Sequence, residues 1–484
     1  MPMLERRTLW LDFTTSLHWT RAPVGIVRME QECCRWMLTK WPDRVRLCVF
    51  DWGKEQFFEM PQSEAWAILN RASDEQAAAT RKASQPAAPE AASGPPPVRL
   101  ARRLERLLRK AVLGTLSALP ARYESGVRRR MIAVRRTLAF AYHEWKAARL
   151  VPLVAAEGPA GLVPAQGAGP SSPGLFQPGD FYLTMGLDWD HGNKMACLYR
   201  EKKRSAFKVV NVIHDIIPVL FPHFYQAGKA QFFASFYATM AWASDHILCN
   251  SQCTARDLKA LLREIETPMP PMTVIREGDT LPKVVGEEHY SNAVRKLAGE
   301  RFLLFVSTVE IRKNHETLYR AYLRLLESGF DAPKLVFVGM QGWRVDDFMA
   351  SLQQDLRVED RIVILNNVTD VELNLLYQRC LFTLYPSLYE GWGLPVAESL
   401  AHGKFCLASH AASVPEIAGD IIDYADPWNV PEWAEKIRHY CADSAALEAR
   451  EKLIATQYRI TSWEVTADQI MEVVDGYAPP GASA

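Results

Sequence analysis

The sequence lacks a long apolar run, an excess of charge and a cysteine pattern for metal binding. No apolar stretch approaches the roughly 18 residues of a membrane span, and the opening MPMLERRTLW has no signal-peptide core, so we expect a cytoplasmic protein. Lysine plus arginine and aspartate plus glutamate number 56 each. The nine cysteines are scattered, and no second ligand pair accompanies Cys249 and Cys253, so buried thiols are expected rather than a metal site.

What the sequence does have is the length and composition of a globular protein with more than one domain. Of its 484 residues, 48% are apolar and 23% charged. We predict an N-terminal domain over 1–285, a C-terminal domain over 286–460, and a C-terminal helix over 461–484 that crosses back to the N-terminal domain. Pro/Ala-rich stretches at about 70–175 predict an insertion in the first domain, made of flexible linkers and basic helices.

Short apolar runs outside the insertion alternate with stretches of helical periodicity. The runs that we predict as strands are Thr8–Phe13, Val45–Phe50, Asp180–Met185, Lys208–Ile213, 245–249, 272–278, Phe302–Val306, Lys334–Gly339, Arg361–Leu365 and Leu381–Tyr385. Runs that are apolar throughout belong to parallel sheets covered on both faces. The fold class is therefore α/β, with two Rossmann-like, doubly wound parallel sheets and a ligand site in the cleft between them, at the carboxyl ends of the strands.

The predicted insertion carries most of the charge asymmetry. Between Val98 and Pro152 there are fourteen lysines and arginines against three acidic residues, with leucines at helical spacing. A solvated surface helix explains this pattern about as well as attachment to an anionic membrane surface, where each basic residue contributes roughly 1 kcal/mol. Nucleic-acid binding is not favoured, because no aromatic platform accompanies the charge.

The stretch YPSLYEGWGLPVAESL at 385–400 is the most informative in the chain. Its glycines allow backbone N–H groups to approach a ligand closely, and a helix that begins near Leu394 points its positive end at the same place, which suits a diphosphate. Glu390 and Glu398 could accept hydrogen bonds from sugar hydroxyls. An acidic residue that merely stabilises a helix N-terminus, worth about 0.3–1 kcal/mol, would explain Glu390 but not the glycine-rich bend.

This stretch resembles the signature of the retaining glycosyltransferases of family four, which have the GT-B fold. Other stretches that resemble the family are Phe305–His315, Val338–Trp343, Asn366–Leu373, Ser413–Asp420 and Ser462–Ala467. In the first half, Gly179–Asp190 and Val212–Pro222 resemble enzymes that transfer mannose or rhamnose onto bacterial surface polysaccharides. The resemblance covers nearly all of the chain outside the insertion.

The resemblance implies roles for individual residues of the C-terminal domain. Glu390 would contact the hydroxyls of the donor sugar, Glu398 the ribose of the nucleotide, and Arg312 and Lys313 the leaving diphosphate. The other implied donor-binding residues are Gly391, Trp392, Gly393 and Leu394. Some members carry a further arginine near the position of Ser307, and its absence here makes the diphosphate more dependent on Arg312 and Lys313.

Candidate residues of the N-terminal domain follow the strands. His214 ends a strand, where it could simply cap the loop, but the resemblance places it beside the donor sugar as a catalytic group, with Asp215 orienting its ring. Gly25 lies in a loop that resembles the one approaching the donor phosphates. Asp188-Trp189-Asp190 matches the DxD metal motif of another glycosyltransferase fold; we favour an acceptor-side role for Asp188, Trp189 and Asp215 and expect no metal or other cofactor.

Together these observations predict a retaining hexosyltransferase that moves mannose from GDP-mannose to a polyprenol-linked or growing bacterial surface glycan, at the inner face of the cytoplasmic membrane. A donor of the dTDP-rhamnose or UDP-sugar type is an alternative. A nucleotide-sugar epimerase or phosphorylase with the same two-domain fold is another, and a non-catalytic scaffold that binds glycan or membrane is a third.

Overall fold

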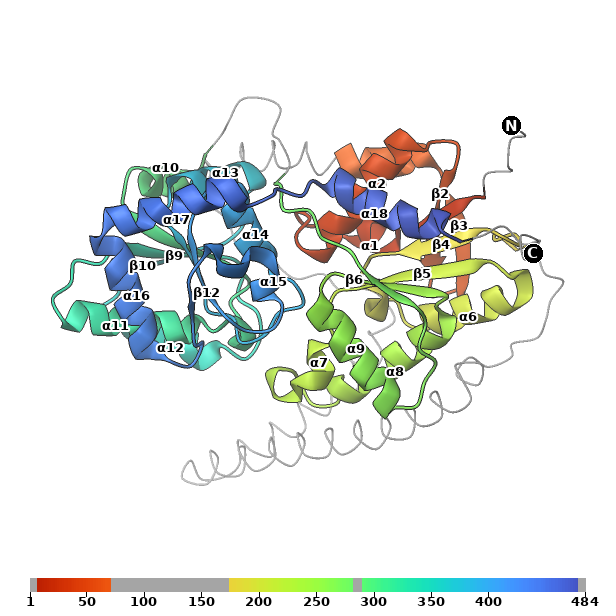
Figure 1. Cartoon of the computed structure of the whole chain (residues 1–484). Helices are drawn as coiled ribbons and strands as arrows, with labels where there is room; N and C mark the ends of the chain where they lie inside the picture. The colour runs from red at the N-terminus through yellow and green to blue at the C-terminus, as the bar shows by residue number, and fades with distance from the viewer. Residues whose placement is uncertain (1–6, 71–173, 282–289, 478–484) are drawn as a thin grey trace, which may run out of the picture.

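The computed structural model describes residues 7–70, 174–281 and 290–477, which form two α/β domains joined side by side (Figure 1). The predicted basic insertion and the boundary near residue 285 lie outside the described residues. Eight of the nine cysteines are buried, Cys441 is partly buried, and all nine are free thiols, as expected.

The N-terminal domain is built on a seven-stranded sheet with the order β3-β2-β1-β4-β5-β6-β7. All neighbouring strands are parallel except β2 and β3, which form an antiparallel hairpin at the edge. The strands are β1 Leu9–Asp12, β2 Val45–Asp51, β3 Gln56–Met60, β4 Phe181–Thr184, β5 Lys208–Ile213, β6 His246–Cys249 and β7 Met272–Val274. The helices are α1 Thr14–His18, α2 Ile26–Lys40, η3 Asp188–Asp190, α6 Lys194–Ser205, α7 Ile217–Leu220, η4 Pro222–Phe224, α8 Lys229–Ala243 and α9 Gln252–Glu264.

The C-terminal domain has a six-stranded parallel sheet with the order β10-β9-β8-β11-β12-β13. Its strands are β8 Phe302–Val306, β9 Lys334–Val338, β10 Ile362–Leu365, β11 Thr383–Tyr385, β12 Cys406–Ser409 and β13 Tyr424–Ala425. Its helices are α10 Asn292–Ala298, η5 Ile311–Lys313, α11 His315–Glu327, α12 Asp346–Gln354, α13 Asp370–Arg379, α14 Leu394–Ala401, α15 Val414–Ala418, η6 Gly419–Ile421, α16 Val430–Ala442 and α17 Ser444–Gln457. The predicted pair of doubly wound sheets is thereby confirmed.

The last helix, α18 (Trp463–Asp475), packs on α2 in the N-terminal domain (Figure 1, dark blue against red). Its buried face, from Trp463 to Val474, belongs to the same apolar cluster as Met29 and Cys33 of α2. An alanine in place of Gly278 would bring its Cβ within 2.5 Å of the Trp463 ring, so the chain segment after β7 passes directly under this helix.

Both sheets reverse their strand order once, which fixes where a ligand can bind. In doubly wound sheets the crevice lies at the carboxyl ends of the two strands that flank the reversal. The reversal falls between β1 and β4 in the N-terminal domain and between β8 and β11 in the C-terminal domain. The loop after β8 holds Arg312 and Lys313, and the loop after β11 holds Glu390.

Candidate functional site

Glu390 is the centre of a buried charge cluster at the reversal point of the C-terminal sheet. Its Oε2 accepts a hydrogen bond from Arg312 Nη1 at 2.7 Å, and its Oε1 accepts from Lys313 Nζ at 2.6 Å. Tyr385 and Ser387 donate their hydroxyls to the same Oε1, at 3.0 and 2.5 Å. The structure therefore brings together three of the residues that the sequence singles out, from two separate loops.

The cations decide the charge state of Glu390. Burial alone would raise its pKa, but the charges of Arg312 and then Lys313 outweigh burial and lower the pKa to about 2. Arg312 also contacts Glu310 at 2.8 Å and donates to the carbonyl of Tyr389 at 2.7 Å. Both cations are thus held in fixed positions by carboxylates, with 13% of each side chain exposed.

The predicted contact of Glu390 with sugar hydroxyls is limited by these partners. Within the described residues, Oε1 accepts from three donors, whereas Oε2 accepts from Arg312 alone. A carboxylate oxygen has two lone-pair directions, so Oε2 can accept one further hydrogen bond. The contact with the donor sugar stays a prediction, and the principal interaction seen here is with the two cations.

Glu398 lies on α14 and is engaged across the domain interface. Its Oε1 accepts from Arg28 Nη1 at 2.9 Å, and its Oε2 accepts from the hydroxyl of Tyr377 at 2.9 Å. Arg28, near the start of α2, also contacts Asp370 at 2.5 Å, and all three charged side chains are buried. The loop that contains Gly25 therefore meets the C-terminal domain at Glu398. The predicted ribose contact of Glu398 stays a prediction, because the carboxylate here binds Arg28.

The glycine-rich bend between the two glutamates touches the N-terminal domain directly. A Cβ on Gly391 would lie 1.9 Å from the carbonyl oxygen of His214, so no side chain fits there. Gly393 has a φ of 120° immediately before α14, a conformation that favours glycine. Leu394 begins α14 as predicted, and Trp392 is buried with the Arg276 guanidinium 5.7 Å from its ring centre.

His214 follows β5 and is held by two acceptors. Its Nε2 lies 2.9 Å from the carbonyl oxygen of Met185, and its Nδ1 lies 3.3 Å from Glu277 Oε1. Since both partners only accept, the ring donates from both nitrogens and is protonated; this assignment follows from the partners. Burial lowers the pKa of His214, but the hydrogen bond and charge of Glu277 outweigh burial, so the pKa lies above its ordinary value.

Asp215 does not orient the imidazole as the sequence led us to expect. Its Oδ1 accepts from the backbone N–H of Ile217 at 2.9 Å, at the start of α7, and Glu277 contacts the ring instead. Charge from Arg312 reaches Asp215 and partly offsets the burial that raises its pKa. The residue lies beside the site, since its Cβ is 2.9 Å from the position that a Gly391 side chain would take.

Asp188 and Trp189 lie at the reversal point of the N-terminal sheet but are occupied by structural contacts. Asp188 contacts the fully buried Lys194 at 2.6 Å, and Lys194 also contacts Asp12 at 2.8 Å. Trp189 packs against Phe233 and Phe236. An acceptor-side role for Asp188 and Trp189 stays a prediction.

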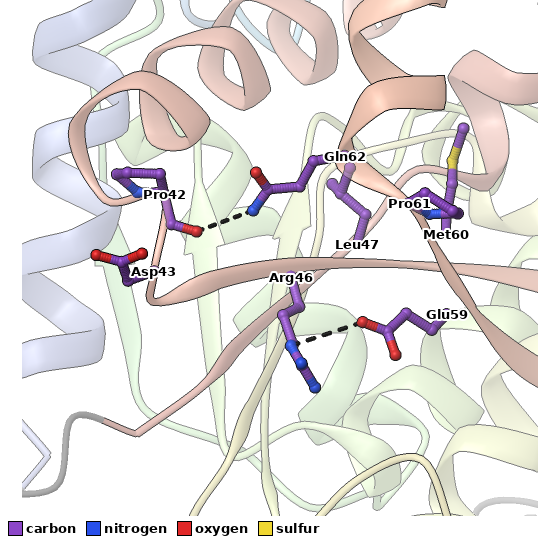
Figure 2. A pocket seen from close by; sticks show the side chains of 8 residues that line it. All are labelled: Pro42, Asp43, Arg46, Leu47, Glu59, Met60, Pro61 and Gln62. Atoms are coloured by element: carbon purple, nitrogen blue, oxygen red, sulfur yellow. Dashed lines mark hydrogen bonds and ion pairs between the residues drawn. The ribbon is translucent and has the colours of Figure 1, made fainter.

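A surface hollow of about 380 Å³ lies at the opposite, amino-terminal end of β2 (Figure 2). It is lined by Pro42, Asp43, Arg46, Leu47, Glu59, Met60, Pro61 and Gln62. Gln62 donates to the carbonyl of Pro42 at 2.9 Å, and Arg46 lies 3.6 Å from Glu59. These polar groups of the hollow therefore contact one another. Because the catalytic candidates lie at the other edge of the sheet, this hollow is not part of their site.

Comparisons with known proteins agree with this geometry. Residues 287–459 match the family model described as glycosyl transferases group 1. The C-terminal domain is a group 1 glycosyltransferase domain. O-antigen chain mannosyltransferase B of Escherichia coli is 34% identical over 170 residues, 35% of this chain and 44% of that protein. The serotype-specific mannosyltransferase WbdA of Escherichia coli is 26% identical over 240 residues, 48% of this chain and 29% of that protein.

The chain thus spans less than half the length of these curated relatives. Among solved structures, HepE of Anabaena in complex with UDP and glucose superposes with a TM-score of 0.55, covering 97% of this chain and all of that one at 13% identity. At that identity the likeness concerns the fold alone, and it agrees with the predicted GT-B architecture.

Two contacts around the site, one within the N-terminal domain and one between the domains, were not revealed by the sequence. Glu277 contacts His214 from 63 positions away, and Arg28 reaches Glu398 across 370 positions. The only available signal for Glu277 was its place near the end of the predicted strand 272–278. Within the described ranges no helix is long and apolar enough to cross a membrane, and no group of three metal-ligating side chains gathers.

Proposed function

We propose that the protein is a retaining glycosyltransferase that transfers mannose from GDP-mannose to a polyprenol-linked or growing bacterial surface glycan. The observation that carries this proposal is the buried pair of cations, Arg312 and Lys313, fixed by Glu390 at the reversal point of the group 1 domain. The choice of mannose is supported by the names of the relatives, two of which are mannosyltransferases that act on or specify bacterial O-antigen or serotype structures.

The reaction would break the bond between the sugar C1 and the diphosphate oxygen and form a bond from C1 to the acceptor oxygen on the same face. The acceptor proton would pass to the departing phosphate oxygen. Arg312 and Lys313 would stabilise the charge that develops on that diphosphate, in a buried place where such contacts are strong. The protonated His214, whose two N–H groups are bound by Met185 and Glu277, would act through its positive charge and by positioning the Gly391 backbone beside the donor.

A panel of donors tests the choice of nucleotide and sugar. GDP-mannose, dTDP-rhamnose and UDP-glucose are compared by thermal denaturation of the whole chain. We expect stabilisation by GDP-mannose, because a ligand present at a hundred times its Kd adds about 2.7 kcal/mol. Stabilisation by dTDP-rhamnose or UDP-glucose alone would replace GDP-mannose with that donor, and the anomeric configuration of the transfer product, read by NMR, tests retention.

A pair of variants tests whether the cation cluster performs the transfer. Glu390→Gln and Lys313→Met are expected to lose transfer to a polyprenol-linked glycan while keeping the circular dichroism of the wild type. Full transfer by either folded variant would refute the role of this cluster. Donor hydrolysis or interconversion without any acceptor would favour the epimerase or phosphorylase alternative, and the absence of nucleotide-sugar binding would favour the scaffold.

The membrane contact is a separate part of the proposal. The fourteen basic residues between Val98 and Pro152 would bring the protein to the anionic cytoplasmic face of the membrane, where a polyprenol-linked acceptor is found. The whole chain should sediment with vesicles that contain anionic lipid and be released by salt, whereas a chain without residues 98–152 should stay in the supernatant. Equal sedimentation of both chains would refute this contact.

A further inference from the structure

Trp52 is an exposed tryptophan at the same edge of the N-terminal sheet as His214. It lies in the turn after β2, and 52% of its surface is exposed. Within the part of the chain that the structure describes, its indole N–H donates no hydrogen bond. An exposed aromatic face with an N–H donor at its edge suits a ligand that has both apolar and hydroxyl faces.

Two histidines hold the indole of Trp52 in place. The ring of His191 is nearly parallel to it, at an interplanar angle of 10° and a centroid distance of 5.9 Å, and His18 lies at 4.7 Å. His191 is only 6% exposed, and its Nε2 lies 3.2 Å from the hydroxyl of Thr15, which fixes the ring. Its other nitrogen, Nδ1, is buried and has no hydrogen-bond partner among the residues that the structure describes.

The His191 ring that packs against Trp52 is uncharged at neutral pH. Burial, reinforced by the charge of Lys194, lowers the pKa of His191 to about 4. The charges of Lys194 and of the two aspartates around it, Asp12 and Asp188, are directed at one another inside the domain. Burial raises the pKa of Glu30 to about 8, so this carboxyl is protonated. The buried groups behind Trp52 are therefore neutral or paired with an opposite charge, whereas Asp51, the residue before Trp52, is a partly exposed carboxylate.

The backbone between Trp52 and His214 runs along one continuous sheet edge. Trp52 follows β2 and His214 follows β5, and the order β2-β1-β4-β5 separates them by three strand spacings, roughly 14 Å. The loops between them are closely packed: a Cβ on Gly186 would lie 2.2 Å from the Thr15 hydroxyl. Met185, the residue before Gly186, accepts the hydrogen bond from His214. An extended chain of sugars that reacts at His214 can therefore follow this edge to Trp52.

We propose that Trp52, supported by His191 and His18, is an acceptor subsite that stacks on a hexose unit of a neutral glycan, distant from the sugar that is being extended. The proposal rests on the proposed function for the chemical class of its ligand. Sugar rings place C–H bonds on an apolar face and hydroxyls around the rim, which match the indole face and its free N–H. The site would select acceptors by length, because only a chain long enough to span the edge reaches it.

Calorimetric titration of the whole chain with α-linked manno-oligosaccharides of two to six sugars tests the subsite without any donor. We expect the wild type to bind longer oligosaccharides more tightly, with a step at the length that reaches Trp52. Trp52→Ala should lose that step, with at least a tenfold weaker Kd for the hexasaccharide and an unchanged Kd for the disaccharide. The matched control is Trp428→Ala, which removes a 71% exposed tryptophan from the C-terminal domain and should bind like the wild type.

The outcomes of this titration separate the subsite from the proposed function. Equal binding of the hexasaccharide by Trp52→Ala and the wild type, binding that does not depend on length, or no binding by the wild type would each overturn the subsite. Failure of the proposed function shows instead as the absence of stabilisation or turnover with any nucleotide sugar. Stabilisation by the donor should be the same in Trp52→Ala as in the wild type, which also shows that the variant is folded.

Discussion

The carboxyl edges of the two sheets each bury a glutamate, and the two glutamates are held in opposite charge states. Glu390, beside Arg312 and Lys313, has a pKa of about 2, whereas Glu30, which contacts no cation within the described residues, has a pKa of about 8. Both pKa values start from the same burial effect, which favours the neutral acid. The difference lies in the partners of the two glutamates. At the C-terminal edge two cations stabilise the ionised form of Glu390, whereas at the N-terminal edge burial keeps Glu30 neutral.

This contrast matches the chemistry of the two proposed substrates. A nucleotide sugar brings two phosphate charges, which need fixed cations, whereas a hexose glycan brings none and would gain nothing from a charged surface. Glu390 contacts both Arg312 and Lys313, so in the proposed reaction the cations would already be in place when the donor binds. The predictions below alter one edge at a time, beginning with the largest expected effect.

Removing a cation from the C-terminal edge should have the largest effect. Arg312→Leu would leave Glu390 and Glu310 buried with less compensation, at a cost of about 3–5 kcal/mol in the free energy of unfolding. Transfer should fall about 10³-fold, as for the loss of one strong donor to a developing charge. Chemical denaturation and kcat/KM for transfer measure the two effects.

The double variant Arg312→Leu/Glu390→Gln separates stability from catalysis. It should recover part of the free energy of unfolding, because the uncompensated carboxylate is gone, without recovering transfer. Arg320→Leu, on the exposed face of α11, is the control and should change neither quantity. Recovery of transfer in the double variant would contradict the role of Arg312 at the leaving group.

Removing the acid from the N-terminal edge should instead stabilise the protein at neutral and higher pH. Glu30 has a pKa of about 8 in the folded protein, against an ordinary value of 4.5, so folding takes up a proton between these pH values and stability falls as the pH rises through them. Glu30→Gln removes this loss, which is roughly 3 kcal/mol of unfolding free energy at pH 7.

Urea denaturation of Glu30→Gln and the wild type between pH 5 and pH 8.5 measures this change. The two stability curves should approach each other at low pH and diverge as the pH rises. Glu64→Gln, on an exposed position of the same domain, is the control and should follow the wild type. Parallel curves for Glu30→Gln and the wild type would show that Glu30 is ionised in the folded protein.

Glu277→Gln should give a smaller effect, visible in the pH dependence of transfer. Without the carboxylate, burial dominates and the pKa of His214 falls, so the alkaline limb of the kcat profile should move to lower pH. The pair also stabilises the folded protein at low pH, and this contribution is lost as the pH rises through the raised pKa of His214.

The profile of Asp215→Asn is the comparison for Glu277→Gln, because Asp215 adds only a minor charge effect on His214 and does not contact its ring. Its alkaline limb should move less than that of Glu277→Gln. A larger shift for Asp215→Asn would assign the orienting role to Asp215 after all.

The smallest expected effect concerns a contact that joins the two edges. Glu416, on α15, accepts hydrogen bonds from the backbone N–H groups of Gln252 and Cys253, at 2.7 and 2.8 Å, in the first turn of α9. Glu416→Gln keeps an acceptor but removes the charge, which is worth about 0.3–1 kcal/mol at a helix N-terminus.

Hydrogen exchange of the Gln252 and Cys253 amides should therefore accelerate by about two- to fivefold in Glu416→Gln. Glu432→Gln, which alters an acidic residue in the first turn of α16 within one domain, is the control and should leave these amides unchanged. Unchanged exchange in Glu416→Gln would show that this contact does not hold the domains together.

The sequence predicts the regular elements well where local patterns are strong. Lys208–Ile213 and Phe302–Val306 have the predicted bounds, and the helix Asp370–Arg379 begins with a capping box between Thr369 and Glu372. The strands β3, β12 and β13 were not predicted. β12 and β13 are only four and two residues long, and β3 is a largely exposed edge strand without an apolar run.

The ion pairs and hydrogen bonds of the site could not be predicted from sequence patterns. Arg312, Lys313 and Glu390 stood out because they lie in recognisable stretches, but the partners of His214 and Glu398 come from distant loops and from the other domain. Nor does the local sequence around Lys194 indicate that its side chain is buried between two aspartates. Such contacts depend on tertiary packing, which brings together residues with no shared local pattern.

The return of α18 to α2 has a consequence for synthesis of the chain. Trp463 and the apolar face that follows it complete a core whose other members, such as Leu9 and Met29, are translated more than 400 residues earlier. The domain that leaves the ribosome first is therefore the last to be finished, and until then the α2 face that α18 covers is exposed. In the cell, that interval is when this domain most needs a chaperone.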